Sequence, residues 1–342
     1  MPRPGSEGHL VEIACDESGY EGDALMGATT DVFAHASARL DAESAADCVA
    51  ELRRRIRSPA EEYKANHLLR QKNRQALVWL LGPSGPLHGH AYVYLVDKAF
   101  LVVATVVGVL LAAEPPAASG PHRDTRAVQL YLAGRRRPGP GGWPAFLLAA
   151  NNLLRATGRL DAREPVDAFF RALDDLRAGP AAPADEVLTL LRHARPRAEA
   201  YRGRMLGDPT TPPPLDPLPP AIARAVARWG GDEGRPVAVV HDQQNTLSPA
   251  RITQLVRLAA GPIRPGRPVG GLRSLRLVDS AFDPRVQVAD FLAGVARKVA
   301  SDRLNGRGDP GLEALVRPYV DPVSVWGDER SWRRLAPPAG TG

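Results

Sequence analysis

The 342-residue chain contains only two cysteines, Cys15 and Cys48. Two cysteines cannot build a disulfide framework, and they are too few for a cysteine zinc cluster. We expect both to be small, buried, apolar side chains in a protein that folds in a reducing compartment. This expectation places the protein in the cytoplasm.

Long apolar runs are also missing. The most apolar stretch spans Phe100 to Ala113, which is shorter than the roughly 20 residues that a membrane-spanning helix needs. We therefore predict that this stretch forms a buried helix and that the protein has no membrane partner. The first nine residues lack the apolar core and the cleavage pattern of a secretory signal peptide, so none is expected.

Lysine is scarce as well: the chain has 44 basic residues, and all but Lys64, Lys72, Lys98 and Lys298 are arginine. Together with many alanines, glycines and prolines, this ratio indicates the codon bias of a GC-rich genome. The formal net charge of +6 suits a polyanionic partner such as nucleic acid. Because the arginine excess has a compositional origin, the charge alone gives weak support for that partner.

What the chain does have is an alternation of strand and helix patterns on both sides of its middle third. Strands are predicted at 9–18, within 23–36, and at 88–100, 235–242 and 272–281. Helices are predicted at 41–58, 67–82, 220–231, 248–261 and 283–304, the last opening with an Asp-Pro cap. This alternation predicts an α/β fold in which helices cover a sheet.

The middle of the chain, from Glu114 to about Pro220, has a different composition. Proline-rich segments bound it, and the residues between them follow helical patterns rich in Leu, Ala and Phe. We predict a helical insertion that interrupts a single domain and serves either as a cap beside the active face or as an arm for homodimerisation. Its Arg135, Arg136 and Arg137 are candidates for contacting a phosphate backbone, although a solvated loop is the simpler interpretation of one charge cluster.

Two of the predicted strands end in acidic residues. The first strand continues into the sequence "DESG", which begins at Asp16, and the later strand "VAVVHD" ends at Asp242. Strand alternation puts Asp16 and Glu17 on opposite faces, and likewise His241 and Asp242. Because ligands of α/β sheets bind beyond the carboxyl ends of strands, Asp16 and Asp242 are the expected inward-facing ligands.

A third acid lies within an apolar helical pattern. Asp290, in "RVQVADFLAG", has apolar residues on both sides, and a carboxylate in such a place costs free energy unless something pairs with it. Gln287 lies three residues earlier on the same helical face. We expect this face to line a polar site, and the alternative is an acid at the solvent-exposed edge of the helix.

Together these motifs resemble a known family. The chain has "DESG" at Asp16–Gly19, "EYK" at Glu62–Lys64, "VVHD" ending at Asp242 and "VDSAFDPRVQVADFLAG" at Val278–Gly294. In this order they are similar to the family catalogued as domain of unknown function 3800. The similarity covers both ends of the chain and skips the middle, where the proline-bounded insertion departs from it. The resemblance implies a ribonuclease-H-like mixed sheet flanked by helices and, by analogy with that fold, divalent-metal phosphodiester chemistry.

The resemblance therefore implies a nuclease or a related phosphodiester hydrolase that uses Mg²⁺ or Mn²⁺. Two such ions, roughly 3.5–4 Å apart, activate a water and stabilise the leaving oxygen, and they need few protein carboxylates because they keep several waters. Asp16 would bridge the ions, and Asp242 and Asp290 would hold one each. Glu62 is a candidate fourth ligand, and Lys64 is a candidate contact to the scissile phosphate. A solvated charge run is the alternative for these last two residues.

Two further functions remain open for the same fold: a non-catalytic nucleic-acid-binding protein and an ATP-using protein. The chain has neither a P-loop nor a G-x-G-x-x-G motif after a predicted strand, which disfavours the second. Three converging carboxylates disfavour the first. The sequence also leaves open whether Glu17, Glu62 or Asp279 joins the site.

Overall fold

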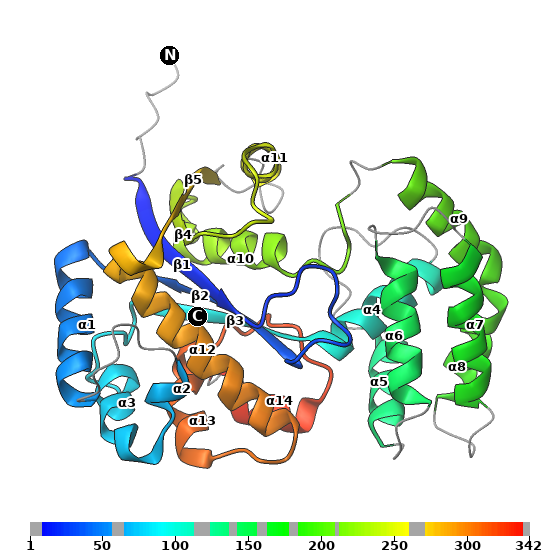
Figure 1. Ribbon diagram of the computed structural model, residues 1–342, viewed down its shortest axis with the longest axis horizontal. Helices are drawn as coiled ribbons and strands as arrows, with labels where there is room; N and C mark the ends of the chain where they lie inside the picture. The colour runs from blue at the N-terminus through cyan, green and yellow to red at the C-terminus, as the bar shows by residue number, and fades with distance from the viewer. Residues whose placement is uncertain are drawn as a thin grey trace.

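The protein is an α/β structure with a five-stranded mixed sheet flanked by helices (Figure 1). The computed structural model describes residues 9–56, 65–112, 124–136, 142–155, 163–177, 184–208, 212–259 and 271–337. The predicted α/β class is confirmed at this level.

The sheet has the strand order β3-β2-β1-β4-β5. Its strands are β1 (Val11–Ser18), β2 (Val32–Ala38), β3 (Ala91–Asp97), β4 (Val237–Asp242) and β5 (Leu272–Val278). Strand β2 runs antiparallel to β1 and β3, whereas β4 runs parallel to β1 and β5. Strand β1 is therefore central, and its carboxyl end lies beside the carboxyl end of β4.

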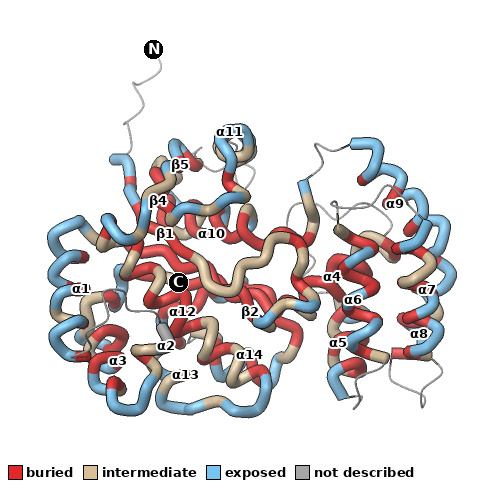
Figure 2. The backbone as a smooth tube through the Cα atoms, viewed as in Figure 1, coloured by how far each residue is buried: buried red, intermediate tan, exposed pale blue. Residues whose placement is uncertain are grey.

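Helices cover both faces of this sheet, which explains why its inner strands are apolar along almost their whole length. Every residue of β2 is buried, and Figure 2 shows the strands as the most buried part of the molecule. Cys15 and Cys48 are both unpaired and buried, as predicted. The outer edge of β3 is covered by the C-terminal segment, which bridges to it at Val320 and Val325.

The face of the sheet that carries Asp16 is covered chiefly by α12 (Pro284–Leu304), which packs along β1 and β2. Around it lie the shorter helices α1 (Ala42–Ile56), α2 (Ala65–Leu68), α3 (Arg74–Leu81), α13 (Pro310–Val316) and α14 (Glu329–Leu335). The other face is covered by α10 (Leu218–Gly230), whose Trp229 donates to the Ser37 hydroxyl of β2. Helix α11 (Pro249–Ala259) packs beside β5.

Local sequence signals explain where several helices begin. Asp283 caps α12 by accepting from the Arg285 amide at 3.0 Å, and Pro284 follows it, as the Asp-Pro pattern predicts. The single helix predicted at 67–82 is wrong, because that stretch is divided into α2, the 3₁₀ turn η1 (Gln71–Asn73) and α3. The Asn73 side chain donates to the His67 carbonyl at 2.6 Å, and such a bond competes with a continuous helix.

The middle of the chain forms helices only, within the ranges that the structure describes. They are α5 (Thr125–Arg135), α6 (Trp143–Leu154), α7 (Arg163–Arg177), α8 (Asp185–His193) and α9 (Arg195–Gly207). These helices pack with α4 (Lys98–Leu111) into a lobe beside the sheet (Figure 1). Helix α4 is the predicted buried helix, and it starts directly after β3, where Asp97 caps it by accepting from the Phe100 amide. No described helix combines the length and apolarity required to cross a membrane.

The helical lobe holds the loop that follows β1. In that loop, Met26 donates its amide to Asn151 Oδ1 of α6 at 2.7 Å, and Asn151 Nδ2 donates to the Asp23 carbonyl at 2.9 Å. Asn151 is only 1% exposed, and both the oxygen and the nitrogen of its side-chain amide form hydrogen bonds within the protein. The lobe therefore fixes the backbone just beyond the carboxyl end of the central strand.

Candidate active site

Helix α12 runs beside β1 in the same direction, and two contacts mark the ends of their shared interface. Near the start, Arg285 Nη1 of α12 donates to Glu12 Oε1 of β1 at 2.6 Å. Near the end, Arg297 Nε donates to Ser18 Oγ at 2.9 Å. The helix rises about 18 Å from Arg285 to Arg297, and the strand rises about 20 Å from Glu12 to Ser18. The two elements therefore lie side by side over nearly the same length.

Asp16, Asp242 and Asp290 come together within this interface. Ala14 of β1 pairs with Val240 of β4, and both pack against Val286 of α12 in a small apolar cluster. Two residues further along each strand, on the same face, stand Asp16 and Asp242. One helical turn beyond Val286 stands Asp290. The structure therefore brings the three acids to one side of the sheet, each supplied by a different element.

Asp16 is the most buried of the three acids, with 6% of its surface exposed. Burial raises the pKa of its carboxyl well above the usual value, and the nearby charges of Glu17, Asp290 and Asp242 raise it further. One bond acts in the opposite direction, because the Glu17 amide donates to Asp16 Oδ1 at 2.7 Å. Asp16 is thus a buried acid whose charged neighbours among the described residues are other acids.

Backbone amides orient two of the three carboxylates. Asp242, half-buried at the end of β4, accepts from the Ser280 amide through Oδ1 at 2.9 Å. Ser280 begins η2 (Ser280–Phe282), the turn that leads into α12. Within the described ranges, neither Asp16 nor Asp242 forms an ion pair with a basic side chain, and the Oδ2 atom of each makes no hydrogen bond. One oxygen of each carboxylate is therefore fixed while the other stays available.

The three acids suit a hard divalent cation in donor type and in charge, since Mg²⁺ and Mn²⁺ prefer carboxylate oxygen and water. A cation would also offset the repulsion that raises the pKa of Asp16. As placed in the structure, the three acids do not form a metal site, because no group of three His, Cys, Asp or Glu side chains among the described residues is arranged to hold a metal ion.

Glu17 faces the other side of the sheet, away from the three acids. Its Oε1 accepts from Gln244 Nε2, and its Oε2 lies 3.5 Å from His241 Nε2. His241 Nε2 in turn lies 3.3 Å from His35 Nε2 of β2, and both histidines are fully buried. Burial lowers the pKa of His35 well below its usual value. Glu17 therefore has polar partners of its own and does not join the site of Asp16.

Four other residues are candidates from the sequence. Glu62 and Lys64 lie outside the described residues. Asp279 is exposed and caps η2 by accepting from the Ala281 amide. Gln287, expected to line the polar site, donates to the carbonyls of Ser280 and Ala281 and so holds η2 in place.

Of the three arginines in the predicted phosphate-contacting loop, the structure describes Arg135 and Arg136. Arg135 belongs to the last turn of α5, where it donates to the Tyr131 hydroxyl and to the Leu304 carbonyl at the end of α12. Arg135 is exposed but belongs to a helix and not to a loop, and it joins the lobe to α12. Arg136 is exposed just after that helix, and Arg137 lies outside the described residues.

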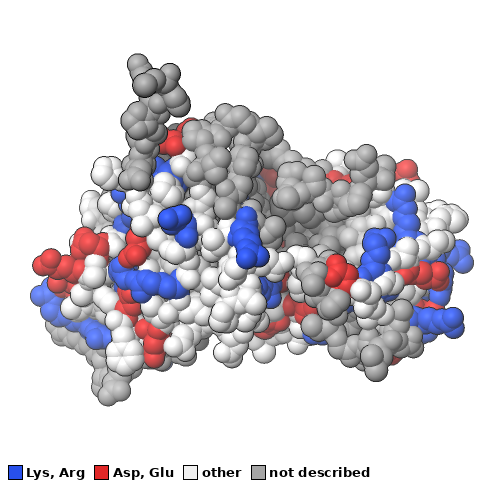
Figure 3. All heavy atoms as spheres, turned by 90° about the horizontal axis from the view of Figure 1, so that it is seen from above, with Lys and Arg blue, Asp and Glu red and all other residues white. Residues whose placement is uncertain are grey.

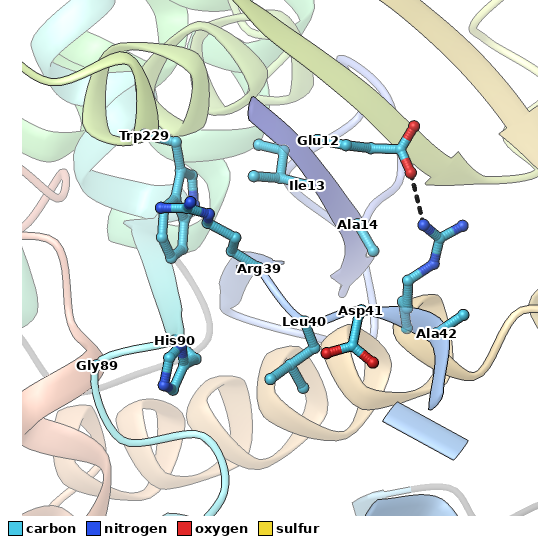
Figure 4. Close-up of a pocket in the computed structure, with 11 residues that line it drawn as sticks. Glu12, Ile13, Ala14, Arg39, Leu40, Asp41, Ala42, Gly89, His90 and Trp229 are labelled. Atoms are coloured by element: carbon cyan, nitrogen blue, oxygen red, sulfur yellow. Dashed lines mark hydrogen bonds and ion pairs between the residues drawn. The ribbon is translucent and has the colours of Figure 1, made fainter. Parts of the chain in front are cut away.

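A cavity of about 660 Å³ lies at the opposite end of β1 (Figure 4). Glu12 and the ion-paired Arg285 border it on one side, and Arg39 extends beside Trp229 on the other. None of the three clustered acids lines it. Of the two acids that line it, Glu12 is paired with Arg285. The charges of Asp242 and Asp290 instead raise the pKa of Asp16, so we place the candidate active site at the three acids.

Surface charge adds little to the choice of partner. On the face drawn in Figure 3, the described lysines and arginines form separate patches with acidic side chains between them. A continuous basic track, the usual electrostatic footprint for nucleic acid, is not seen among the described residues of this face.

Comparisons with known proteins give no match: no protein family, no curated protein and no solved structure matches the chain. The candidate active site therefore stands on its geometry, and the resemblance drawn from the sequence motifs stays a prediction.

Proposed function

We propose that the protein is a metal-dependent nuclease or a related phosphodiester hydrolase, with Asp16, Asp242 and Asp290 as its metal ligands. One observation carries this proposal. A buried carboxylate on the central strand has acids for neighbours and no ion-pairing base among the described residues. Such an arrangement costs stability in the protein alone, and a bound cation offsets that cost.

The sheet supports the proposal without deciding it. Its strand order and directions are compatible with a ribonuclease-H-like fold. The acids lie at the carboxyl end of its central strand, which is where ligands of open α/β sheets bind.

In this proposal, Mg²⁺ or Mn²⁺ supplies an activated water and neutralises the charge that develops on a phosphodiester. Backbone amides of the chain position two of the three carboxylates: the Glu17 amide donates to Asp16, and the Ser280 amide donates to Asp242. Glu62 remains a proposed fourth ligand and Lys64 a proposed phosphate contact. Nucleic acid is the proposed substrate.

The test is cleavage of labelled single-stranded and double-stranded DNA and RNA by the purified protein with Mg²⁺, Mn²⁺ or EDTA. Cleavage that requires the cation, and that an Asp16→Asn preparation made in the same way lacks, is the expected result. Cation-independent cleavage, cleavage retained in Asp16→Asn, or no cleavage of any of the four substrates would each reject the proposal.

A further inference from the structure

Arg297 is a half-buried cation at the end of the interface between α12 and β1. It follows Asp290 by seven residues, which is two helical turns, so the two side chains leave α12 in nearly the same direction. Among the described residues, the guanidinium makes one hydrogen bond, through Nε to Ser18 Oγ, and no ion pair. Burial accordingly lowers the pKa of Arg297.

The acids nearest to Arg297 already have other partners. Asp31, Glu21 and Asp302 all influence its charge, but Glu21 pairs with Lys98, Asp302 with Lys298, and Asp31 accepts from Asn305. Among the residues that the structure describes, the two Nη groups of Arg297 therefore have no anionic partner and are available to another anion.

Two residues of the "DESG" sequence, Ser18 and Gly19, lie against Arg297. Ser18 orients the guanidinium by accepting from Nε. Gly19 has a φ of +78°, and a Cβ atom there would lie 2.8 Å from Arg297 Cδ and 2.5 Å from the Val32 carbonyl oxygen. The backbone conformation and the close approach of the Val32 carbonyl require glycine at this position, and Arg297 packs against it.

We propose that Arg297 and Ser18 form a phosphate-binding subsite for the strand whose phosphodiester lies at the three acids. This inference rests on the proposed function and extends it. The Asp290 and Arg297 Cα atoms are about 10 Å apart along the helix axis, so the subsite holds a neighbouring phosphate and not the scissile one. A planar guanidinium binds two phosphate oxygens at once, and the subsite thereby fixes which bond in the strand reaches the acids.

The experiment measures binding, without turnover, in an Asp16→Asn background with EDTA present. Affinities for labelled single-stranded and double-stranded DNA and RNA are measured over a range of salt concentrations. Arg297→Gln is expected to weaken binding several-fold and to reduce the slope of log K against log salt by about one. Arg297→Lys is expected to restore the slope, because it restores the charge.

Lys298→Gln is the matched control. It removes the same charge from the neighbouring position of α12, where the side chain is 42% exposed and pairs with Asp302. We expect its slope to stay close to that of the parent. Ser18→Ala leaves the charge but removes the bond that orients it, so affinity should fall while the slope is kept.

An Arg297→Gln slope equal to that of the parent, or no binding of any of the four oligonucleotides by the parent, overturns the subsite. The proposed function fails separately. If the wild type cleaves nothing with Mg²⁺ or Mn²⁺ while the slope still depends on Arg297, the nuclease proposal is rejected and phosphate binding stands. Thermal melts of each variant confirm that the comparison is made between folded proteins.

Discussion

The two faces of the sheet at the carboxyl end of β1 hold acids in opposite electrostatic settings. On the α12 face, Asp16 is buried and its nearest charges are those of other acids. On the other face, burial also raises the pKa of Glu17, but His241 and Gln244 act to lower it. Asp16 and Glu17, which are adjacent in β1, therefore differ in the charge of the side chains around them.

This difference separates a structural acid from a candidate catalytic one. Buried carboxylates are normally paired or hydrogen-bonded, and Glu17 follows that rule. Asp16 accepts one backbone hydrogen bond but has no basic partner among the described residues, and clustered acids that raise one another's pKa are typical of sites tuned for chemistry. The following predictions test whether the two faces differ as this comparison requires.

The largest expected effect is on catalysis. Asp16→Asn should lower kcat/KM for a cleaved substrate by more than about 100-fold, because losses of about 10–100-fold are typical of residues that only support a metal ligand. Glu17→Gln, the matched change on the next residue, should stay within about 10-fold of the wild type. Steady-state kinetics on both variants provide the measurement. Equal losses in the two variants would remove the distinction between the faces.

A smaller effect is expected on stability in the presence of cations. Saturating Mg²⁺ or Mn²⁺, at about 100 times its Kd, should stabilise the folded protein by about 2.7 kcal/mol, because the ion binds the folded site and not the unfolded chain. Thermal melts with the cation and with EDTA measure this as an upward shift of Tm. Glu17→Gln should keep the shift and Asp16→Asn should lose it. A shift that survives in Asp16→Asn would place the cation elsewhere.

The smallest effect is the pH dependence of stability without a cation. The pKa of Asp16 is raised in the folded protein, so the folded state keeps a proton that the unfolded chain releases above its pKa of about 3.9. Stability is therefore lost as pH rises from about 4 toward the folded-state pKa. One pKa unit corresponds to about 1.4 kcal/mol.

The Asp16→Asn variant has no carboxyl group at this position, so it does not lose stability in this way as pH rises. Urea unfolding in EDTA should show the variant gaining stability relative to the wild type by at least about 1 kcal/mol between about pH 4 and about pH 8. A difference in unfolding free energy that stays constant with pH, or that falls as pH rises, would contradict a pKa raised by burial and neighbouring acids.

The sequence alone determined the features that follow from local periodicity. The two-residue repeat of a strand separates Asp16 from Glu17 and His241 from Asp242, and the structure has both pairs on opposite faces. The Asp-Pro cap set the start of α12, and the helical repeat then set the direction of Asp290. Backbone geometry imposes these repeats on the chain one residue at a time, so they can be read without knowing the fold.

Only the tertiary structure decided which distant residues meet. His35 contacts His241 because β2 and β4 flank β1 in the observed register. Arg297 reaches Ser18 because α12 lies along β1 in the same direction. The seven-residue spacing from Asp290 was the one sequence signal for this arginine, and it was missed. Such contacts depend on strand order, register and helix placement, which arise from burial summed over the whole core and leave no mark at any single position.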